Sequence, residues 1–262
     1  MAETNKAAAA AVPHRLGGSD GRPEVVFVHG FGADRLAWLA NAPALAGAFK
    51  VWGVDLPGHG DAEPGQDNSL DGLADAVLAG LAPHLSGKVH LVGHSLGGAL
   101  ALRLAQRAPD RVRSIVLIAP AGLGRGIDGD FTAGLARLEE PDPALALLQR
   151  LVARPRLINK AMALHVLAHL DRPGRRQALS ALAENLPAIE ETVQPAIAAI
   201  RQGDLPRMVI WGEDDAINPL DPERLANFGG ERHIVPGAGH LPQIEEITRV
   251  NGWIQDFLTA HS

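Results

Sequence analysis

The chain alternates short apolar runs with longer stretches in which alanine and leucine recur at helical spacing. Most of the short runs are apolar at nearly every position, which is typical of parallel strands buried on both faces. Such runs separated by helices predict an α/β fold, a mainly parallel sheet with helices on both faces. The expected strands are Glu24–Val28, Lys50–Val54, Lys88–Val92, Ser114–Ile118, Arg207–Trp211 and Glu231–Val235. The expected helices are Leu36–Ala46, Leu70–Leu85, Leu96–Ala108, Pro222–Phe228 and Gln243–Leu258.

The stretch from Leu123 to Gln202 breaks this alternation, because it is rich in Ala, Leu and Arg, contains several prolines and shows no strand pattern. It predicts a helical cap insertion, residues 123–202, within a core formed by residues 1–122 and 203–262. An insertion at this point would lie beyond the carboxyl ends of the strands, where open α/β sheets bind ligands. It could therefore act as a lid over the site, the alternative being a purely structural helical layer.

Composition narrows the class of protein further. A chain of 262 residues that is 46% hydrophobic can form one large domain with its own core. The net charge is -6, and the Lys and Arg residues are scattered along the chain and form no basic cluster. We therefore expect neither nucleic acid nor an anionic membrane as a partner. The absence of cysteine excludes disulfides, thiolate nucleophiles and Cys-ligated zinc. Residues 1–12 lack the apolar stretch of a signal peptide, and no run reaches the roughly 18 apolar residues of a membrane span, so we expect a cytoplasmic protein.

One motif carries a candidate nucleophile. Gly93-His94-Ser95-Leu96-Gly97 follows an apolar run and precedes a helical one. Strand, sharp turn and helix are the context in which a G-x-S-x-G sequence presents a strained, reactive serine at a helix N-terminus. The alternative interpretation is a turn with glycines for packing alone. The context favours Ser95 as a nucleophile.

A serine hydroxyl needs an imidazole to accept its proton and an acid to orient that imidazole. His240 lies in a glycine-rich loop between the last expected strand and the last helix. Glu213, Asp214 and Asp215 follow the strand that ends at Trp211, and the spacing alone does not choose among them. The order Ser, acid, His is that of α/β-hydrolases.

The first expected strand runs into His29-Gly30-Phe31-Gly32, a loop that can point a backbone N–H at the nucleophile. The N–H groups of Phe31 and Leu96 would together form an oxyanion hole for a tetrahedral intermediate. A tight turn that merely ends the strand is the alternative. Asp55 ends another strand and is the weakest rival for the triad acid.

Three other histidines are candidates for a chemical role. His94 neighbours the nucleophile, but its side chain should point elsewhere, which makes it a structural or tuning residue. His165 and His169 are spaced like two metal ligands on one helix face, yet no further ligand stands nearby in the sequence. We therefore expect no metal and no cofactor.

These pieces together resemble the α/β-hydrolase superfamily over almost the whole chain. In that family the acid of the triad occupies the last position of W-G-x-x-D, and the resemblance therefore implies Asp215. The matching segments are VVFVHGFG, DLPGHG, VHLVGHSLGGALALRLA, RVRSIVLIAPAGLG, MVIWGEDDAINP and VPGAGHLPQIE.

A narrower resemblance links NAPALA, LIAPAGLGRGID and RRQALSALAENL to the hydrolase-like domain of acetoin dehydrogenase acyltransferase components. In those proteins a lipoyl domain precedes the hydrolase-like part. We expect this chain to lack that domain, because few residues precede its first strand, and it has no H-x-x-x-D-G acyltransferase motif.

The preferred function is that of a serine hydrolase, of the carboxylic ester type, acting on a small acyl substrate through an acyl-enzyme. Three alternatives use the same fold: an acyltransferase related to the acetoin dehydrogenase component, a carbon–carbon bond hydrolase of a diketone-like compound, and a non-catalytic ligand-binding protein. The expected partner is a small-molecule acyl substrate, and the sequence leaves the oligomeric state open.

Overall fold

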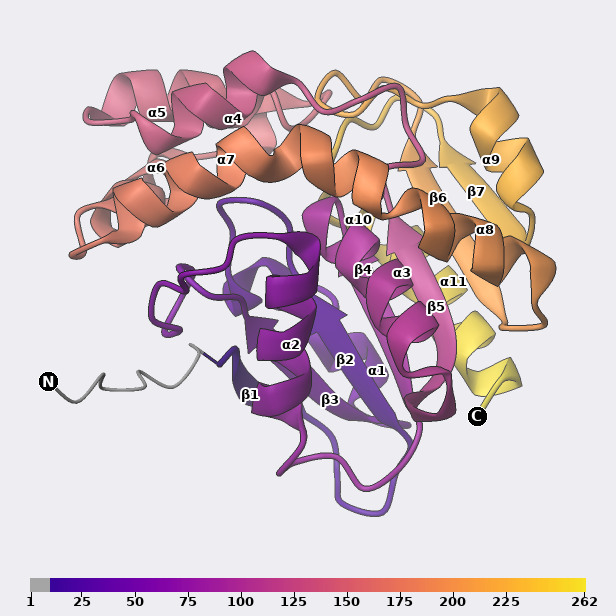
Figure 1. Cartoon of the computed structure of the whole chain (residues 1–262). Helices are drawn as coiled ribbons and strands as arrows, with labels where there is room; N and C mark the ends of the chain where they lie inside the picture. Colours follow the sequence, from indigo (N-terminus) through magenta and orange to yellow (C-terminus); the bar gives the residue numbers. More distant parts are fainter. Residues whose placement is uncertain (1–9) are drawn as a thin grey trace, which may run out of the picture.

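A computed structural model describes residues 10–262 of the chain (Figure 1). Its strands are β1 (Val12–Gly17), β2 (Glu24–Val28), β3 (Lys50–Asp55), β4 (Val89–His94), β5 (Val112–Ile118), β6 (Arg207–Gly212) and β7 (Glu231–Val235). They form one seven-stranded sheet in the order β1-β3-β2-β4-β5-β6-β7. Strand β1 runs antiparallel to β3, and the other neighbours are parallel. The α/β fold with a mainly parallel sheet is confirmed.

The helices fill the connections between these strands. The helices before β6 are η1 (Arg35–Trp38), α1 (Ala42–Leu45), α2 (Leu70–Leu81), α3 (Leu96–Arg107), η2 (Pro109–Arg111), α4 (Gly129–Ala136), α5 (Pro141–Gln149), η3 (Pro155–Leu157), α6 (Lys160–Leu170), α7 (Arg175–Thr192) and α8 (Gln194–Gln202). Those after β6 are α9 (Pro222–Phe228), α10 (Pro242–Glu245) and α11 (Ile247–Ala260).

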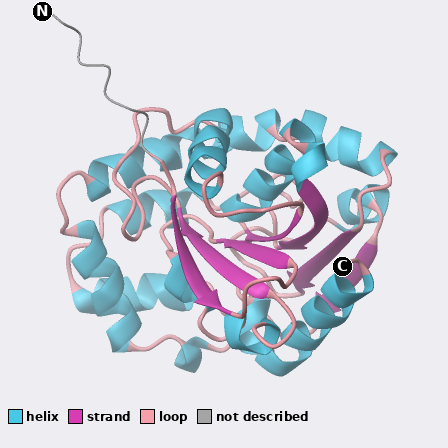
Figure 2. Ribbon diagram, turned by 90° about the horizontal axis from the view of Figure 1, so that it is seen from below, coloured by secondary structure: helices cyan, strands magenta, loops and turns pink. Residues whose placement is uncertain are grey.

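Two apolar clusters sandwich the sheet, because successive side chains of a strand point to opposite faces. In β2, Val26 and Val28 join the cluster that α2, α3 and α8 cover, whereas Val25 and Phe27 join the cluster that α1 and α11 cover. Figure 2 shows the twisted sheet with helices on both sides. All five residues of β2 are buried, which accounts for its unbroken apolar sequence.

The predicted strands are confirmed within one or two residues, but β1 was missed. Its sequence contains Pro13 and two basic side chains, and it is only partly buried. Proline is tolerated in an edge strand because one side of that strand needs no sheet partner. A half-exposed edge strand therefore carries no clear apolar pattern for sequence reasoning to detect.

The predicted helix Leu36–Ala46 is wrong as a single element. It divides into η1 and α1, and Pro43 stands in the first turn of α1. A proline lacks the N–H that a longer helix would need there and disfavours helical geometry in the residue before it. Similarly, Pro83 stops α2 at Leu81, short of the predicted Leu85.

The predicted helix Gln243–Leu258 also divides, into α10 and α11. Glu246 joins the two helices with φ -126° and ψ 52°, outside the helical region. The interruption follows directly after Glu245, whose buried carboxylate accepts hydrogen bonds from two other loops. Helix α10 therefore lies beside the His240 loop, whereas α11 packs on the sheet.

Between β5 and β6 the described chain is helical throughout, from α4 to α8, as predicted. Figure 1 shows α4 to α7 across the top of the molecule, above the strands. Helices α4, α5, α6 and the first half of α7 share an apolar cluster of their own, whereas α8 packs with α3 in a cluster of the sheet. The division into a core and a cap at residues 123 and 202 stays a prediction.

Within residues 10–262 none of the helices has the length and apolarity that a bilayer crossing requires. The interpretation of residues 1–12 as lacking a signal peptide falls mostly on residues outside the described part of the chain.

Candidate active site

Ser95 stands at the turn between β4 and α3 with a strained backbone, φ 54° and ψ -116°. A residue with a Cβ rarely adopts a positive φ, so surrounding bonds must hold it there. The Ser95 N–H donates to the Ile118 carbonyl at 2.9 Å, and the Ser95 carbonyl accepts from the amides of Ala99 and Ala121 at 3.2 and 3.0 Å. The elbow is thus held by backbone bonds, and in the part of the chain that the structure describes no hydrogen bond engages the Ser95 hydroxyl.

The glycines of this motif allow the elbow to pack closely. A Cβ at Gly97 would lie 2.2 Å from the Val28 carbonyl oxygen, and a Cβ at Gly93 would lie 2.2 Å from the carbonyl oxygen of Gly97. Any larger residue at these positions would push α3 away from the sheet. The two glycines therefore bring Ser95 close to the loop that follows β2.

His240 and Asp215 form a buried pair next to this elbow. His240 Nδ1 and Asp215 Oδ2 are 2.8 Å apart, and the side chains are 3% and 0% exposed. The other carboxylate oxygen, Oδ1, accepts from the amides of Ile217 and Asn218, both at 2.9 Å. Three donors hold the carboxylate in one orientation, and the carboxylate in turn fixes the orientation of the imidazole ring.

The same contacts set the charge of the acid. Burial raises the pKa of Asp215, but the charge and the hydrogen bond of His240, together with the amides of Asn218 and Ile217, outweigh burial and lower its pKa below the ordinary value. Asp215 is therefore an ionised acceptor at neutral pH. Its neighbours Glu213 and Asp214 are exposed, and neither contacts His240 by a hydrogen bond.

Ser95 and His240 both line the main pocket of the described chain. Among residues 10–262, no hydrogen bond joins the Ser95 hydroxyl to His240. Catalytic hydrogen bonds are often long before substrate is bound and shorten in the complex. The structure thus brings the three predicted residues to one place at the carboxyl ends of β4, β6 and β7.

The predicted oxyanion hole combines the loop after β2 with the first turn of α3. Leu96 is the first residue of α3, where an amide has no partner within the helix. In the described part of the chain neither the Phe31 N–H nor the Leu96 N–H donates a hydrogen bond. Both amides are thus available to a ligand oxygen, and Phe31 lines the pocket beside Ser95.

Two histidines that the sequence reasoning left without a role connect the Phe31 loop to the loop after β3. His29 Nδ1 donates to the Gly30 carbonyl at 2.8 Å, and its Nε2 accepts from the Leu56 amide at 3.1 Å. His59 Nε2 accepts from the Gly32 amide at 3.1 Å. Its Nδ1 donates to the Pro57 carbonyl at 3.0 Å. Burial and the neighbouring His29 lower the pKa of His59 to about 3, so its ring is a neutral imidazole with one donor and one acceptor nitrogen.

His94 contacts the backbone of the candidate base. Its Nε2 donates to the His240 carbonyl at 2.9 Å, and the two rings are 4.7 Å apart. Burial and the His240 ring lower the pKa of His94 to about 3. The predicted structural or tuning role of His94 agrees with this contact.

Sequence reasoning did not identify Glu245, which anchors the loop of His240. Its carboxylate is fully buried and accepts from the amides of Gly239 and Ala153 at 2.5 and 3.0 Å. It thereby ties the His240 loop to the loop after α5. The final glutamate of the VPGAGHLPQIE segment was the available signal for this residue.

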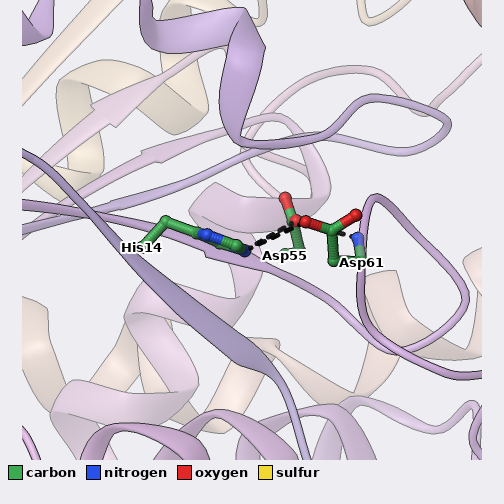
Figure 3. Close-up of side chains that lie close together, drawn as sticks. All are labelled: His14, Asp55 and Asp61. Atoms are coloured by element: carbon green, nitrogen blue, oxygen red, sulfur yellow. Dashed lines mark hydrogen bonds and ion pairs between the residues drawn. The ribbon is translucent and has the colours of Figure 1, made fainter.

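Asp55 belongs to an ion-pair network and does not contact His240. Figure 3 shows His14 from β1 beside Asp55 and Asp61. His14 Nε2 is 3.3 Å from Asp55, and the ligand atoms of the three residues lie within 4.8 Å of one another. The Arg35 guanidinium bonds to Asp55 and is 3.0 Å from Asp61, so a cation already balances these carboxylates. We assign the cluster a structural role.

The Asp55→Ala variant is expected to lower the free energy of unfolding by about 3 kcal/mol, because it leaves the Arg35 guanidinium without its buried partner. Asp61→Ala removes the other carboxylate of the same arginine, but Asp61 is 52% exposed and the expected loss is below about 1 kcal/mol. Urea unfolding followed by circular dichroism measures both. Equal losses in the two variants would contradict the assignment.

The pocket above Ser95 has a volume of about 550 Å³ and lies between the loops of the sheet and the helices α4, α5 and α6. None of its described lining residues is Lys or Arg, and Asp34 is its one carboxylate, already bonded to His165. Such a pocket favours uncharged groups. Its apolar walls include Phe31, Leu135, Leu148, Met162, Val166 and Leu241.

Residues 23–247 match the sequence profile of the family described as "alpha/beta hydrolase fold". The chain therefore belongs to the α/β-hydrolase family, whose description names the fold seen here.

Two curated relatives are similar to this chain in sequence, and one solved structure is similar to it in fold. The chain is 39% identical, over 94% of its length, to the dihydrolipoyllysine-residue acetyltransferase component of the acetoin cleaving system of Pseudomonas putida, and it spans 66% of that protein. It is 31% identical to a pimeloyl-[acyl-carrier protein] methyl ester esterase of Neisseria meningitidis, covering 91% of this chain and 78% of that one. The meta-cleavage product hydrolase of Pseudomonas fluorescens superimposes with a TM-score of 0.83 at 21% identity, covering 96% and 95% of the two chains.

Proposed function

We propose that this protein is a serine hydrolase in which Ser95 is the nucleophile, His240 the general base and Asp215 the acid that orients the base. The observation that carries the proposal is the buried His240–Asp215 pair, 2.8 Å apart, which shares a pocket with a strained elbow serine. Within the described residues, the serine hydroxyl makes no structural hydrogen bond that would compete with this role. A turn with a purely structural role would need neither a strained serine nor a buried histidine–aspartate pair beside it.

In the proposed mechanism His240 accepts the Ser95 proton as Oγ attacks the acyl carbon. The amides of Phe31 and Leu96 stabilise the negative oxygen of the tetrahedral intermediate. His240 then returns the proton to the leaving alcohol, which departs and leaves an acyl-enzyme. His240 then takes a proton from a water molecule, which attacks the acyl-enzyme. The bond between the acyl carbon and Ser95 Oγ breaks, His240 returns the proton to Oγ, and the acid is released.

We propose an uncharged ester with an apolar acyl group as the substrate class. An ionised group of the substrate would lose its hydration in this pocket, and no Lys or Arg among the described lining residues would offset that cost. The similarity to a methyl ester esterase supports an ester over other acyl derivatives. Residues 123–202 would act as the cap, since their helices supply much of the apolar wall.

Labelling with a fluorophosphonate and a matched pair of esters test this proposal. We expect the probe to modify Ser95, identified by mass spectrometry of the peptide. We also expect kcat/KM for p-nitrophenyl butyrate to exceed that for p-nitrophenyl hemisuccinate, in which a carboxylate replaces the terminal methyl group of the four-carbon chain, at least about tenfold. An unlabelled Ser95 would instead indicate a pocket used for binding only, and an equal rate for the two esters would contradict the substrate class.

Acyl transfer is a second candidate, favoured by the 39% identity to an acetyltransferase component. It differs from hydrolysis only in the nucleophile that attacks the acyl-enzyme. Assay of the products in the presence of dihydrolipoamide separates the two reactions, because transfer yields a thioester and hydrolysis yields the free acid. A diketone substrate in the same series tests the carbon–carbon hydrolase alternative.

A further inference from the structure

The two histidines of α6 contact the core of the protein from one face of the helix. His165 Nε2 is 2.8 Å from Asp34 Oδ2, and His169 Nε2 donates to the Gly58 carbonyl at 3.1 Å. Residues four apart on a helix lie one above the other, so both contacts can form at the same time. Because their Nε2 atoms point to different partners, the pair does not form the metal site that its spacing resembles.

Both contacts end on the loops that position Phe31. Asp34 is three residues after Phe31 in the loop that follows β2. Gly58 is next to His59, which accepts the Gly32 amide at 3.1 Å, and the rings of His59 and His169 stack with their centroids 6.4 Å apart. The helix α6 is therefore connected to both sides of the candidate oxyanion loop.

The charges of these groups suit lasting hydrogen bonds. Burial raises the pKa of Asp34, but the bond from His165 and the amide of Leu36 outweigh burial and lower it below the ordinary value. Burial lowers the pKa of His169, and Arg175 nearby lowers it further, so its ring is neutral with the proton on the nitrogen that faces Gly58. The contact of α6 with Asp34 thus has an ionised acceptor, and its contact with Gly58 has a neutral donor, the ring of His169.

The substrate pocket lies beside the same contacts. Met162 and Val166 of α6 line the pocket together with His165, His169 and Asp34. A substrate bound there therefore lies against the helix that also contacts the loop carrying Phe31.

We propose that His165 and His169 are positioning residues that connect the cap helix α6 to the oxyanion loop and keep the Phe31 N–H aligned with Ser95. The proposal rests on the proposed function, since it assigns these residues to the same reaction. The alignment of an oxyanion donor changes the free energy of the transition state more than that of the bound ester. Loss of either contact should therefore lower kcat and leave KM nearly unchanged.

The variants His165→Ala and His169→Ala test this inference with p-nitrophenyl butyrate. We expect kcat to fall about tenfold in each, less than the 10²–10³-fold that follows complete removal of one donor, with KM changed by less than about twofold. His165→Gln and His169→Gln place an amide N–H near the position of Nε2 and should recover kcat to within about twofold of the unaltered protein. Leu164→Ala, on the exposed side of α6, is the matched control and should leave both constants unchanged.

Three results would overturn the inference: alanine variants with unaltered kcat, a rise in KM alone, or glutamine variants as slow as the alanine variants. A rise in KM alone would mean that the contacts only hold the cap over the substrate. Thermal unfolding midpoints identify any variant that has lost its fold. Where an alanine variant has done so, kcat of the glutamine variant at the same position decides whether the inference holds. The outcome is separate from that of the proposed function, because Ser95→Ala tests the reaction itself whatever α6 does.

Discussion

Ser95→Ala should abolish ester turnover, with kcat reduced at least about 10⁴-fold, while the protein keeps its fold. The variant removes the atom that forms the acyl-enzyme and leaves only the binding pocket and the oxyanion donors. Alanine is suited to the position because the strained turn is held by the Ser95 backbone, through its bonds to Ile118, Ala99 and Ala121. The thermal unfolding midpoint should therefore stay within a few degrees of the unaltered value.

The measurement is kcat for p-nitrophenyl butyrate together with fluorophosphonate labelling, both of which should be lost. Ser180→Ala, on α7 and outside the pocket, serves as the matched serine control and should retain both. Turnover that survives in Ser95→Ala, in protein with an unaltered unfolding midpoint, would remove Ser95 from the mechanism.

The sequence predicted the centre of this fold well, because parallel strands buried on both faces must be apolar throughout. Strand β2 is an example, with all five residues buried. Prediction was weaker where burial is partial, as in β1, or where a single proline decides between one helix and two, as at Pro43. In such places the local pattern is compatible with several structures, and packing chooses among them.

The residues of the candidate site likewise differ in how far the sequence alone identified them. Ser95 follows from its own surroundings, since it lies in a glycine-rich turn after a fully buried strand. His240 follows from its place in a glycine-rich loop between the last strand and the C-terminal helices. Asp215 required the family resemblance, because its two acidic neighbours occupy the same loop and only the folded chain shows which carboxylate is turned inward.

The supporting contacts were beyond sequence reasoning for a different reason. His165 and Asp34 are 131 residues apart in the chain, and Glu245 and Ala153 are 92 apart. Nothing in either local sequence identifies its partner, because the pairing depends on how the helices between β5 and β6 lie over the sheet. The i, i+4 spacing of the α6 histidines was visible, but the only role it suggested was a metal site, for which the sequence offered no further ligand.

Asp215→Asn is expected to reduce kcat about 10⁴-fold with little change in structure, through the tautomer of His240. The amides of Ile217 and Asn218 donate to one side of the carboxylate and will hold the single oxygen of the asparagine there. The asparagine NH₂ then faces His240 Nδ1, which must accept a hydrogen bond. The imidazole proton consequently moves to Nε2, and that nitrogen can no longer accept the proton of Ser95.

The control is Asp214→Asn, which removes one charge from the adjacent, exposed position and should leave kcat within about twofold. Kinetics of p-nitrophenyl butyrate hydrolysis over a range of concentrations separate kcat from KM, and KM should stay close to its original value in both variants, since neither change alters the walls of the pocket. A large loss in Asp214→Asn with activity kept in Asp215→Asn would exchange the roles of the two residues. The stated result would establish that the hydrogen bond to Nδ1, and not the negative charge of the loop, makes His240 a base.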